Sequence, residues 1–128
     1  MLFRSGLSLL TKVLDEAAYS HLDTLGDRMR KGMRSILDRL DIPGLVMGIG
    51  SMATILFNRL ERVTNYREAI LSDQKIFEKY WFGCLNRGVM LMGPKWSEES
   101  MIMTAHNEKD IDEALNVIED VLKVVARS

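Results

Sequence analysis

The sequence has 128 residues, a length that fits one domain with a sizeable core. Its 17 Lys and Arg residues against 18 Asp and Glu residues leave a net charge of −1, which argues against nucleic acid as a partner. No apolar run approaches the roughly 18 residues that cross a membrane, so we expect no membrane association. The single cysteine, Cys84, excludes an intramolecular disulfide and favours a reducing compartment, so we expect a cytoplasmic protein.

The first part of the chain has a helical pattern. Apolar residues recur at spacings of three and four over residues 7–40, and a single helix of that length is unusual in a small domain. We therefore expect a break near residues 16–20, with a short helix before it and a longer one after it. Pro43 and Gly44 then stop the second helix. Residues 45–58 favour extended structure, in which two glycines mark a bend between two strand pieces.

Two further helices are expected after these strands. The first is a short helical turn over Tyr66–Leu71, which either Thr64 or Asn65 can cap. The second has Ser72 as its expected N-cap, and Gly88 lies where a left-handed residue ends a helix.

The central stretch predicts two strands that flank a polar loop. The short apolar runs Val89–Met92 and Met101–Thr104 are the expected strands. The last helix has the clearest signal, because Asn107 and Asp110 form a variant of the capping box and a regular apolar stripe follows. The whole pattern predicts one α+β domain over residues 1–128: a small, mostly antiparallel β-sheet covered on one face by helices.

Few residues offer chemistry. Cys84 lies on an apolar helix stripe with no histidine near it in the sequence, which favours a buried small side chain over a nucleophile. His106 sits at a strand-to-helix junction, where imidazole more often caps or packs than catalyses, and His21 is expected to be structural. These residues have no metal-ligand spacing. Glu98 and Glu99 form the best acidic pair, although adjacent carboxylates on a loop are usually only solvated. The residues alone predict no self-contained active site.

Five segments carry a resemblance to a known family. They are Tyr19–Gly26, Gly50–Phe57, Tyr66–Ala69 leading to Ser72-Asp73, Phe77 with Leu85–Val89, and Thr104–Asp112. The Gly-Ser-Met piece and the Ala-His-x-x-x-Asp-Ile-Asp piece are the more specific of them in combination. In this order they resemble the C-terminal domain of fold-type I, class III pyridoxal-phosphate aminotransferases, and among these glutamate-1-semialdehyde 2,1-aminomutase.

The resemblance implies that the cofactor, pyridoxal phosphate, belongs to a large domain that this sequence does not resemble anywhere. None of the seven lysines has the context of a Schiff-base lysine, so we expect no cofactor or catalytic residue in this chain. By resemblance the substrate-side glutamate falls on Glu98, or on Glu99 because this loop is one residue longer. Gly50, Ser51 and Met52 are further expected contacts of the substrate.

Two hypotheses follow from the resemblance. In the first, the chain is the C-terminal domain of such an aminomutase or aminotransferase, shapes the substrate pocket when joined to its large domain, and is inactive alone. In the second, it is a free-standing, non-catalytic domain for self-association or protein–protein interaction. A domain adapted to a larger partner exposes apolar surface, so we also expect a homo-oligomer formed through exposed apolar faces.

Overall fold

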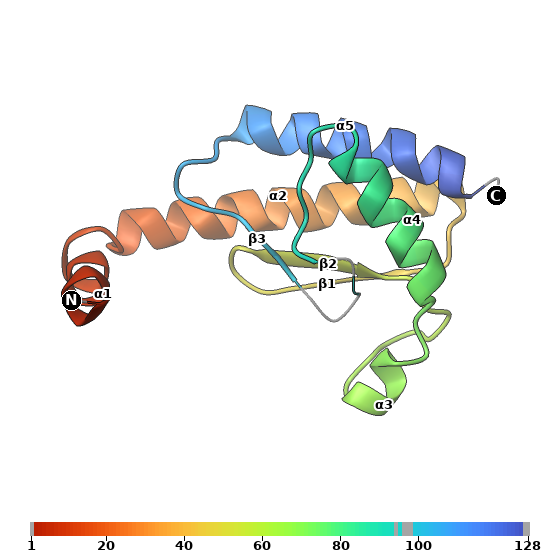
Figure 1. Cartoon of the computed structure of the whole chain (residues 1–128), viewed down its shortest axis with the longest axis horizontal. Coiled ribbons are helices and arrows are strands. Elements are labelled where there is room, and N and C mark those ends of the chain that lie inside the picture. The colour runs from red at the N-terminus through yellow and green to blue at the C-terminus, as the bar shows by residue number, and fades with distance from the viewer. Residues whose placement is uncertain (1, 94, 96–98, 127–128) are drawn as a thin grey trace.

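A computed structural model describes residues 3–93, 95 and 99–126, and of Leu2 the backbone alone. The elements in chain order are α1 (Leu2–Lys12), α2 (Glu16–Leu40), β1 (Leu45–Met47), β2 (Met52–Leu56), α3 (Tyr66–Ala69), α4 (Gln74–Leu85), β3 (Ser100–Met101) and α5 (Glu108–Val125). The strands form one antiparallel sheet in the order β1-β2-β3, which confirms the predicted α+β class (Figure 1). Within the described residues, no helix is both long and apolar enough to cross a lipid bilayer.

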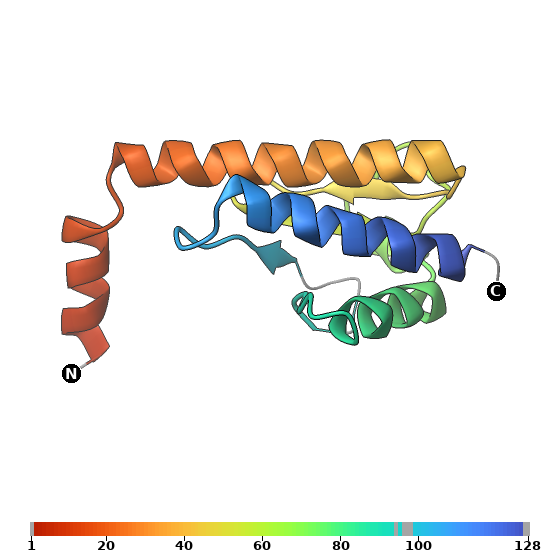
Figure 2. The same cartoon turned by 90° about the horizontal axis from the view of Figure 1, so that it is seen from above.

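The break between the first two helices lies just before the expected region. The side chain of Asp15 accepts a hydrogen bond from the Ala18 backbone N–H at 2.8 Å and so caps α2, which places the start of the helix at Glu16. Beyond this break, α1 stands apart from the other elements at the far end of α2 (Figures 1 and 2).

Helix α2 packs along one face of β1 and β2 and supplies much of the core. In the antiparallel ladder, Val46 pairs with Ile55 and Met47 with Thr54. Alternation along β2 points Ala53 and Ile55 toward α2, and both are fully buried. Helix α2 is therefore stabilised by the packing of its apolar stripe against the sheet and α5.

The N-cap of α4 is Asp73, so the prediction of Ser72 was wrong by one residue. The Asp73 carboxylate accepts from the Ile76 N–H at 3.0 Å, whereas the Ser72 hydroxyl is buried and accepts from the Asn58 side-chain amide at 3.3 Å. Serine and aspartate can both cap a helix. Here the Ser72 hydroxyl is engaged by the buried Asn58 side chain, so Asp73 provides the cap. Asn65 caps α3, as one of the two expected alternatives.

The predicted strand at Val89–Met92 does not form. Gly88, with φ 86°, ends α4, and the Val89 N–H returns to the Cys84 carbonyl at 3.0 Å. The Trp81 indole then donates to the Leu91 carbonyl at 3.0 Å, and the Met92 N–H donates to the Ser100 hydroxyl at 3.2 Å. Side chains thus satisfy backbone groups that a ladder would otherwise pair.

The second strand of the predicted pair forms only in part. β3 is limited to Ser100–Met101, where the prediction was Met101–Thr104. Its pairing with β2 is continued by the Ile102 N–H, which donates to the Ser51 carbonyl at 2.9 Å. The chain turns at Thr104 and Ala105, where the His106 N–H donates to the Met103 carbonyl at 3.0 Å, so the strand cannot extend to residue 104.

Helix α5 closes the core, and its predicted capping box is present. The Asn107 side chain accepts from the Asp110 N–H, while the Asp110 carboxylate accepts from the Asn107 N–H. The helix runs alongside α2 and also contacts α4 (Figure 2). Its buried side chains Ile118 and Leu122 pack into the same core as the sheet.

Candidate functional site

The face of the sheet turned away from α2 is rich in methionine. Directly opposed residues in an antiparallel ladder point to the same side, and here Met47 opposes Thr54 and Met52 opposes Met101. These four residues alternate with the core residues Ala53 and Ile55, so they share the other face, which we call the methionine face. Met47 and Met52 are half-buried and Met101 is exposed, so in this chain the face is only partly covered.

A hollow of about 340 Å³ lies over one part of this face. Met47, Thr54 and Leu56 line its floor, and Glu99 forms part of its wall. The rest of its wall comes from the segment that leads into α3 and from α3 itself, namely Val63, Thr64, Asn65, Tyr66 and Ala69. The space therefore combines an apolar floor with a carboxylate, hydroxyls and an amide.

Strand pairing brings Glu99 to this hollow. Ser100 pairs with Ala53, so Glu99, one residue earlier on the antiparallel strand, comes beside Thr54. Glu99 is half-buried there. Glu98, the first choice for the substrate-side carboxylate, lies outside the described residues. The structure thus gives a location to Glu99 alone of the predicted acidic pair.

The other predicted contacts lie in the turn between β1 and β2 and at the first residue of β2. Gly50, Ser51 and Met52 are all half-buried and lie at the end of the sheet where Met52 pairs with Met101. Gly48 precedes them with φ 139°, and a Cβ there would overlap the Met52 carbonyl oxygen, so the tight turn requires glycine. The turn does not line the hollow, but it borders the same methionine face.

Several lining residues were not predicted as site residues. Thr54, Thr64, Asn65 and Tyr66 all reach the hollow, yet only the resemblance and the capping signal had drawn attention to their segments. The strand alternation of β2 carries a usable signal for Thr54, since a polar residue between Ala53 and Ile55 indicates the face opposite the core.

The remaining chemical groups have structural roles. Burial raises the pKa of the Cys84 thiol to about 12, which keeps it neutral, as expected for a buried small side chain. The His106 Nδ1 accepts from the Met103 N–H at 3.0 Å, and the His21 ring nitrogen Nε2 lies 2.9 Å from the His106 carbonyl oxygen. The two histidines therefore hold the turn before α5 against α2.

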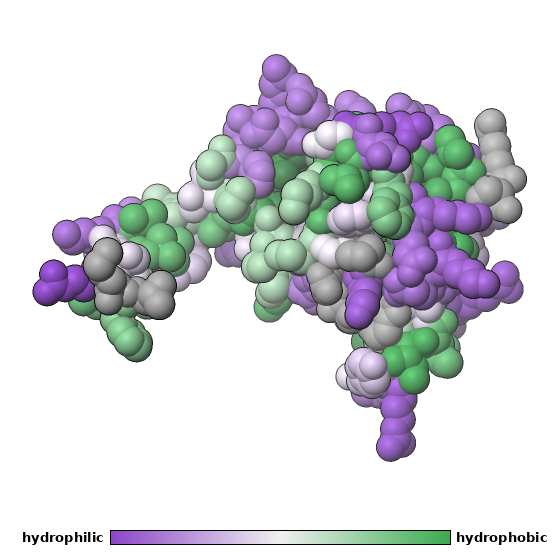
Figure 3. Space-filling view, viewed as in Figure 1, coloured by the Kyte–Doolittle hydropathy of each residue, from purple (hydrophilic) through white to green (hydrophobic). Residues whose placement is uncertain are grey.

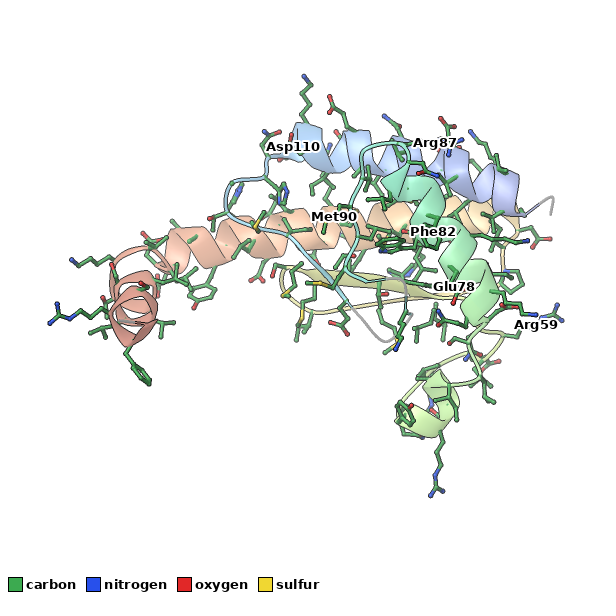
Figure 4. The ribbon with its side chains drawn as sticks, viewed as in Figure 1. Arg59, Glu78, Phe82, Arg87, Met90 and Asp110 are labelled. Carbon is green, nitrogen blue, oxygen red and sulfur yellow. The ribbon has the colours of Figure 1, made fainter. Side chains whose placement is uncertain are left out.

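A second hollow, of about 380 Å³, lies beside α5. Arg87 and Met90, from the segment after α4, and Asp110 of α5 contribute to its wall (Figure 4). The Arg87 guanidinium donates to the Gly83 carbonyl, and the Asp110 carboxylate serves the capping box. This space lies between residues 88–91 and 100–102, where the sequence had predicted a strand pair, and we assign it no chemistry.

The described residues do not fit a pyridoxal-phosphate site. The cofactor needs a lysine amine directed into a cavity, and all seven lysines are exposed. None of them lines either hollow. The part of the chain that the structure describes also contains no group of three or more His, Cys, Asp or Glu residues able to hold a metal ion.

Comparisons with known proteins connect this geometry to a family. No family model matches the chain. Glutamate-1-semialdehyde 2,1-aminomutase from Aquifex aeolicus is 34% identical over 119 residues, covering 93% of this chain and 28% of that protein. The same enzyme from Methanosphaera stadtmanae is 39% identical over 111 residues, covering 87% of this chain and 26% of that protein. The chain thus spans little more than a quarter of the length of these relatives.

Solved structures agree with the sequence comparison. A glutamate-1-semialdehyde aminomutase from Pseudomonas aeruginosa PAO1 superposes with a TM-score of 0.81 and 26% identity, over 92% of this chain and 26% of that one. An omega-transaminase from Sphaerobacter thermophilus, with a TM-score of 0.76 and 21% identity, shares the fold. By sequence and fold, this chain matches the C-terminal portion of pyridoxal-phosphate-dependent enzymes of the glutamate-1-semialdehyde 2,1-aminomutase kind.

Proposed function

We propose that this chain, as one domain over residues 1–128, forms the substrate-closing lobe of a glutamate-1-semialdehyde 2,1-aminomutase-like enzyme and is inactive without a large domain. The observation that carries the proposal is the methionine face, where Glu99 and the turn carrying Ser51 and Met52 lie on one side of the sheet. The chain matches only about a quarter of the length of its relatives, which supports a lobe rather than a complete enzyme.

The residues of this face suit the small amino-acid substrate that the relatives' name indicates. A carboxylate such as Glu99 attracts the ammonium group of an amino acid and orients it. The Ser51 hydroxyl offers a neutral hydrogen-bond partner, and Met52 and Met101 supply adaptable apolar surface that excludes water. Pyridoxal phosphate, held by the large domain, supplies the chemistry at the amino group.

A chimeric enzyme tests the proposal. The matched part of the Aquifex aeolicus enzyme is replaced with this chain, and turnover of glutamate-1-semialdehyde is measured with and without Glu98→Gln and Glu99→Gln. We expect activity in the chimera, a KM raised about tenfold or more by one of the two variants, and no activity from the chain alone. The control is Glu78→Gln, at an exposed position of α4 (Figure 4).

The chain alone provides the refuting result. It is incubated with pyridoxal phosphate, reduced with borohydride and analysed by mass spectrometry. Scattered, partial labelling of several exposed lysines agrees with a lobe that lacks the cofactor site. Stoichiometric modification of one lysine would show that the chain holds the cofactor itself, and the proposal would fail.

Helix α1 carries an exposed apolar stripe that supports a large domain as the partner. Phe3, Leu7 and Leu10 follow one another at spacings of four and three, so they share one face of the helix, and Phe3 is 93% exposed. The green surface of α1 lies apart from the rest of the molecule in Figure 3. We propose that a large domain covers this stripe and that the isolated chain self-associates through it.

Light scattering across micromolar concentrations tests this association. We expect a dimer or higher oligomer for the wild-type chain and a monomer for the variant Leu7→Lys/Leu10→Lys. A wild-type chain that stays monomeric would contradict it. A cytoplasmic location is also part of the proposal and rests on the lone, buried Cys84.

A further inference from the structure

The guanidinium of Arg30 joins α2 to the turn between β1 and β2. Its Nη1 donates to the Gly50 carbonyl and to the Met52 carbonyl, each at 2.6 Å. Its Nη2 donates to the Asp27 carboxylate at 2.7 Å, which fixes the plane of the guanidinium. The Arg30 side chain is only 13% exposed, so these hydrogen bonds are largely shielded from water.

One helical turn before Arg30, the backbone of α2 touches the same turn. A Cβ on Gly26 would overlap the Gly50 carbonyl oxygen. Residues four apart lie on the same helix face, so Gly26 provides the close approach and Arg30 provides the hydrogen bonds. A larger residue at position 26 would separate the two elements and draw the guanidinium away from its carbonyls.

The remaining carbonyls of the turn are also engaged. The Ile49 carbonyl accepts from the Met52 N–H at 3.0 Å, and the Ser51 carbonyl accepts from the Ile102 N–H at 2.9 Å. With the two bonds from Arg30, all four carbonyls from Ile49 to Met52 are held. Two of these four depend on the single Arg30 side chain, which contacts no other part of the sheet by a hydrogen bond among those described.

We propose that Arg30 is a positioning residue that fixes the turn carrying Ser51 and Met52 in the geometry that meets an amino-acid substrate. Arg30 acts through the backbone and does not touch the substrate itself. The substrate part of this inference rests on the proposed function, whereas the clamp on the turn stands on the hydrogen bonds alone.

Hydrogen–deuterium exchange of the full chain tests the clamp. The reporters are the amides of Met52 and Ile102, whose N–H groups close the turn. We expect Arg30→Met to speed their exchange about tenfold or more, and Arg30→Lys, which keeps one donor and the charge, to speed it less. The matched control is Arg34→Met, at an exposed position one turn further along α2.

The core amide of Ile118 in α5 separates positioning from general destabilisation. If Arg30→Met speeds exchange at Ile118 as much as at Met52, Arg30 only stabilises the whole domain and the inference is overturned. Unchanged exchange at Met52 and Ile102 would overturn it as well, because the turn would then be held without Arg30.

The chimeric enzyme tests the use of the clamp. We expect Arg30→Met to raise the KM for the amino substrate about tenfold with a smaller effect on kcat, partial recovery in Arg30→Lys, and little effect of Arg34→Met. A loosened turn with an unchanged KM would overturn the role toward substrate. A chimera that is inactive with the wild-type chain counts against the proposed function, and the exchange experiment still decides whether Arg30 clamps the turn.

Discussion

The contact between α4 and α5 leaves no room for a side chain at Gly83. A Cβ placed there would lie 2.6 Å from Cγ1 and 3.2 Å from Cγ2 of Val121. Val121 is 2% exposed and, as a β-branched residue in a helix, has essentially one rotamer available. We therefore expect Gly83→Ala to force α4 and α5 apart.

Two opposing terms set the size of this effect. Alanine is favoured over glycine in a helix by about 1 kcal/mol, while an added methyl in a packed core costs about 1–3 kcal/mol. Gly83→Ala should therefore lower the free energy of unfolding by about 1 kcal/mol. Urea unfolding followed by circular dichroism measures this difference.

Gly32→Ala is the matched control. A Cβ on Gly32, in α2, would overlap the side-chain tips of Leu115, but Leu115 is only half-buried and can change rotamer. The helix-propensity gain of about 1 kcal/mol then offsets the contact, so we expect a change within about 0.5 kcal/mol.

A double variant tests the cause. Val121→Ala alone should cost about 2 kcal/mol, because it empties part of the core. Combined with Gly83→Ala, the new methyl occupies that space, so the double variant should be about 1–2 kcal/mol more stable than the sum of the single effects predicts. Additive effects, or a Gly83→Ala variant as stable as wild type, would refute this account of the α4–α5 contact.

Three further predictions concern a cap, an ion pair and the thiol. Asn107→Ala should cost about 1 kcal/mol in urea unfolding, because the side chain that accepts from the Lys109 and Asp110 N–H groups is lost, and an unchanged midpoint would contradict it. The Arg28 guanidinium, bonded to Asp112 at 2.7 and 2.8 Å, lowers the pKa of that carboxyl. The ion pair therefore stabilises the fold above the unfolded-state pKa of Asp112, and this stabilisation is lost as the pH falls through the lower folded-state pKa. Asp112→Asn should then make the urea midpoint depend less on pH below about pH 5, measured at low salt. With a pKa of about 12, Cys84 should resist iodoacetamide at pH 8 in the folded chain and react in urea, as mass spectrometry would show.

Local signals in the sequence account for most of the helices. The Asn107–Asp110 box and the apolar stripe after it predicted α5, and the same kind of pattern predicted α2. The error at Ser72 shows the limit of such signals. Ser72 and Asp73 are both good caps, and the choice was made by Asn58, a buried partner 14 residues away.

The segment Val89–Met92 failed as a prediction for a related reason. Its apolar run has the composition of a strand, but a strand also needs a neighbour that pairs with its backbone N–H and C=O groups. Here the Trp81 indole and the Ser100 hydroxyl take that role. Both partners come from other elements, so periodicity within the run could not reveal them.

The candidate site was predictable only through the resemblance. Glu99 reaches Thr54 because Ser100 pairs with Ala53, a register that joins strands more than 40 residues apart in the sequence. Tyr66 enters the hollow on the connection between β2 and α4. No local pattern links Glu99 to Tyr66, and the role of Arg30 depends on a non-local contact of the same kind.

Methionines lie on both sides of the sheet, Met29 and Met33 in α2 on one side and Met47, Met52 and Met101 on the other. Met29 and Met33 fill the core beneath the sheet, as expected of flexible apolar side chains, but Met101 and Met103 remain exposed. Burial of Ala53 and Ile55 against α2 provides stability on one face, while on the other face Met52 is half-buried and Met101 is exposed. A soft, partly open face is suited to closing over another surface, because unbranched methionine side chains can adapt to it. The strand alternation that builds the core therefore also places the proposed substrate-facing groups on the opposite side.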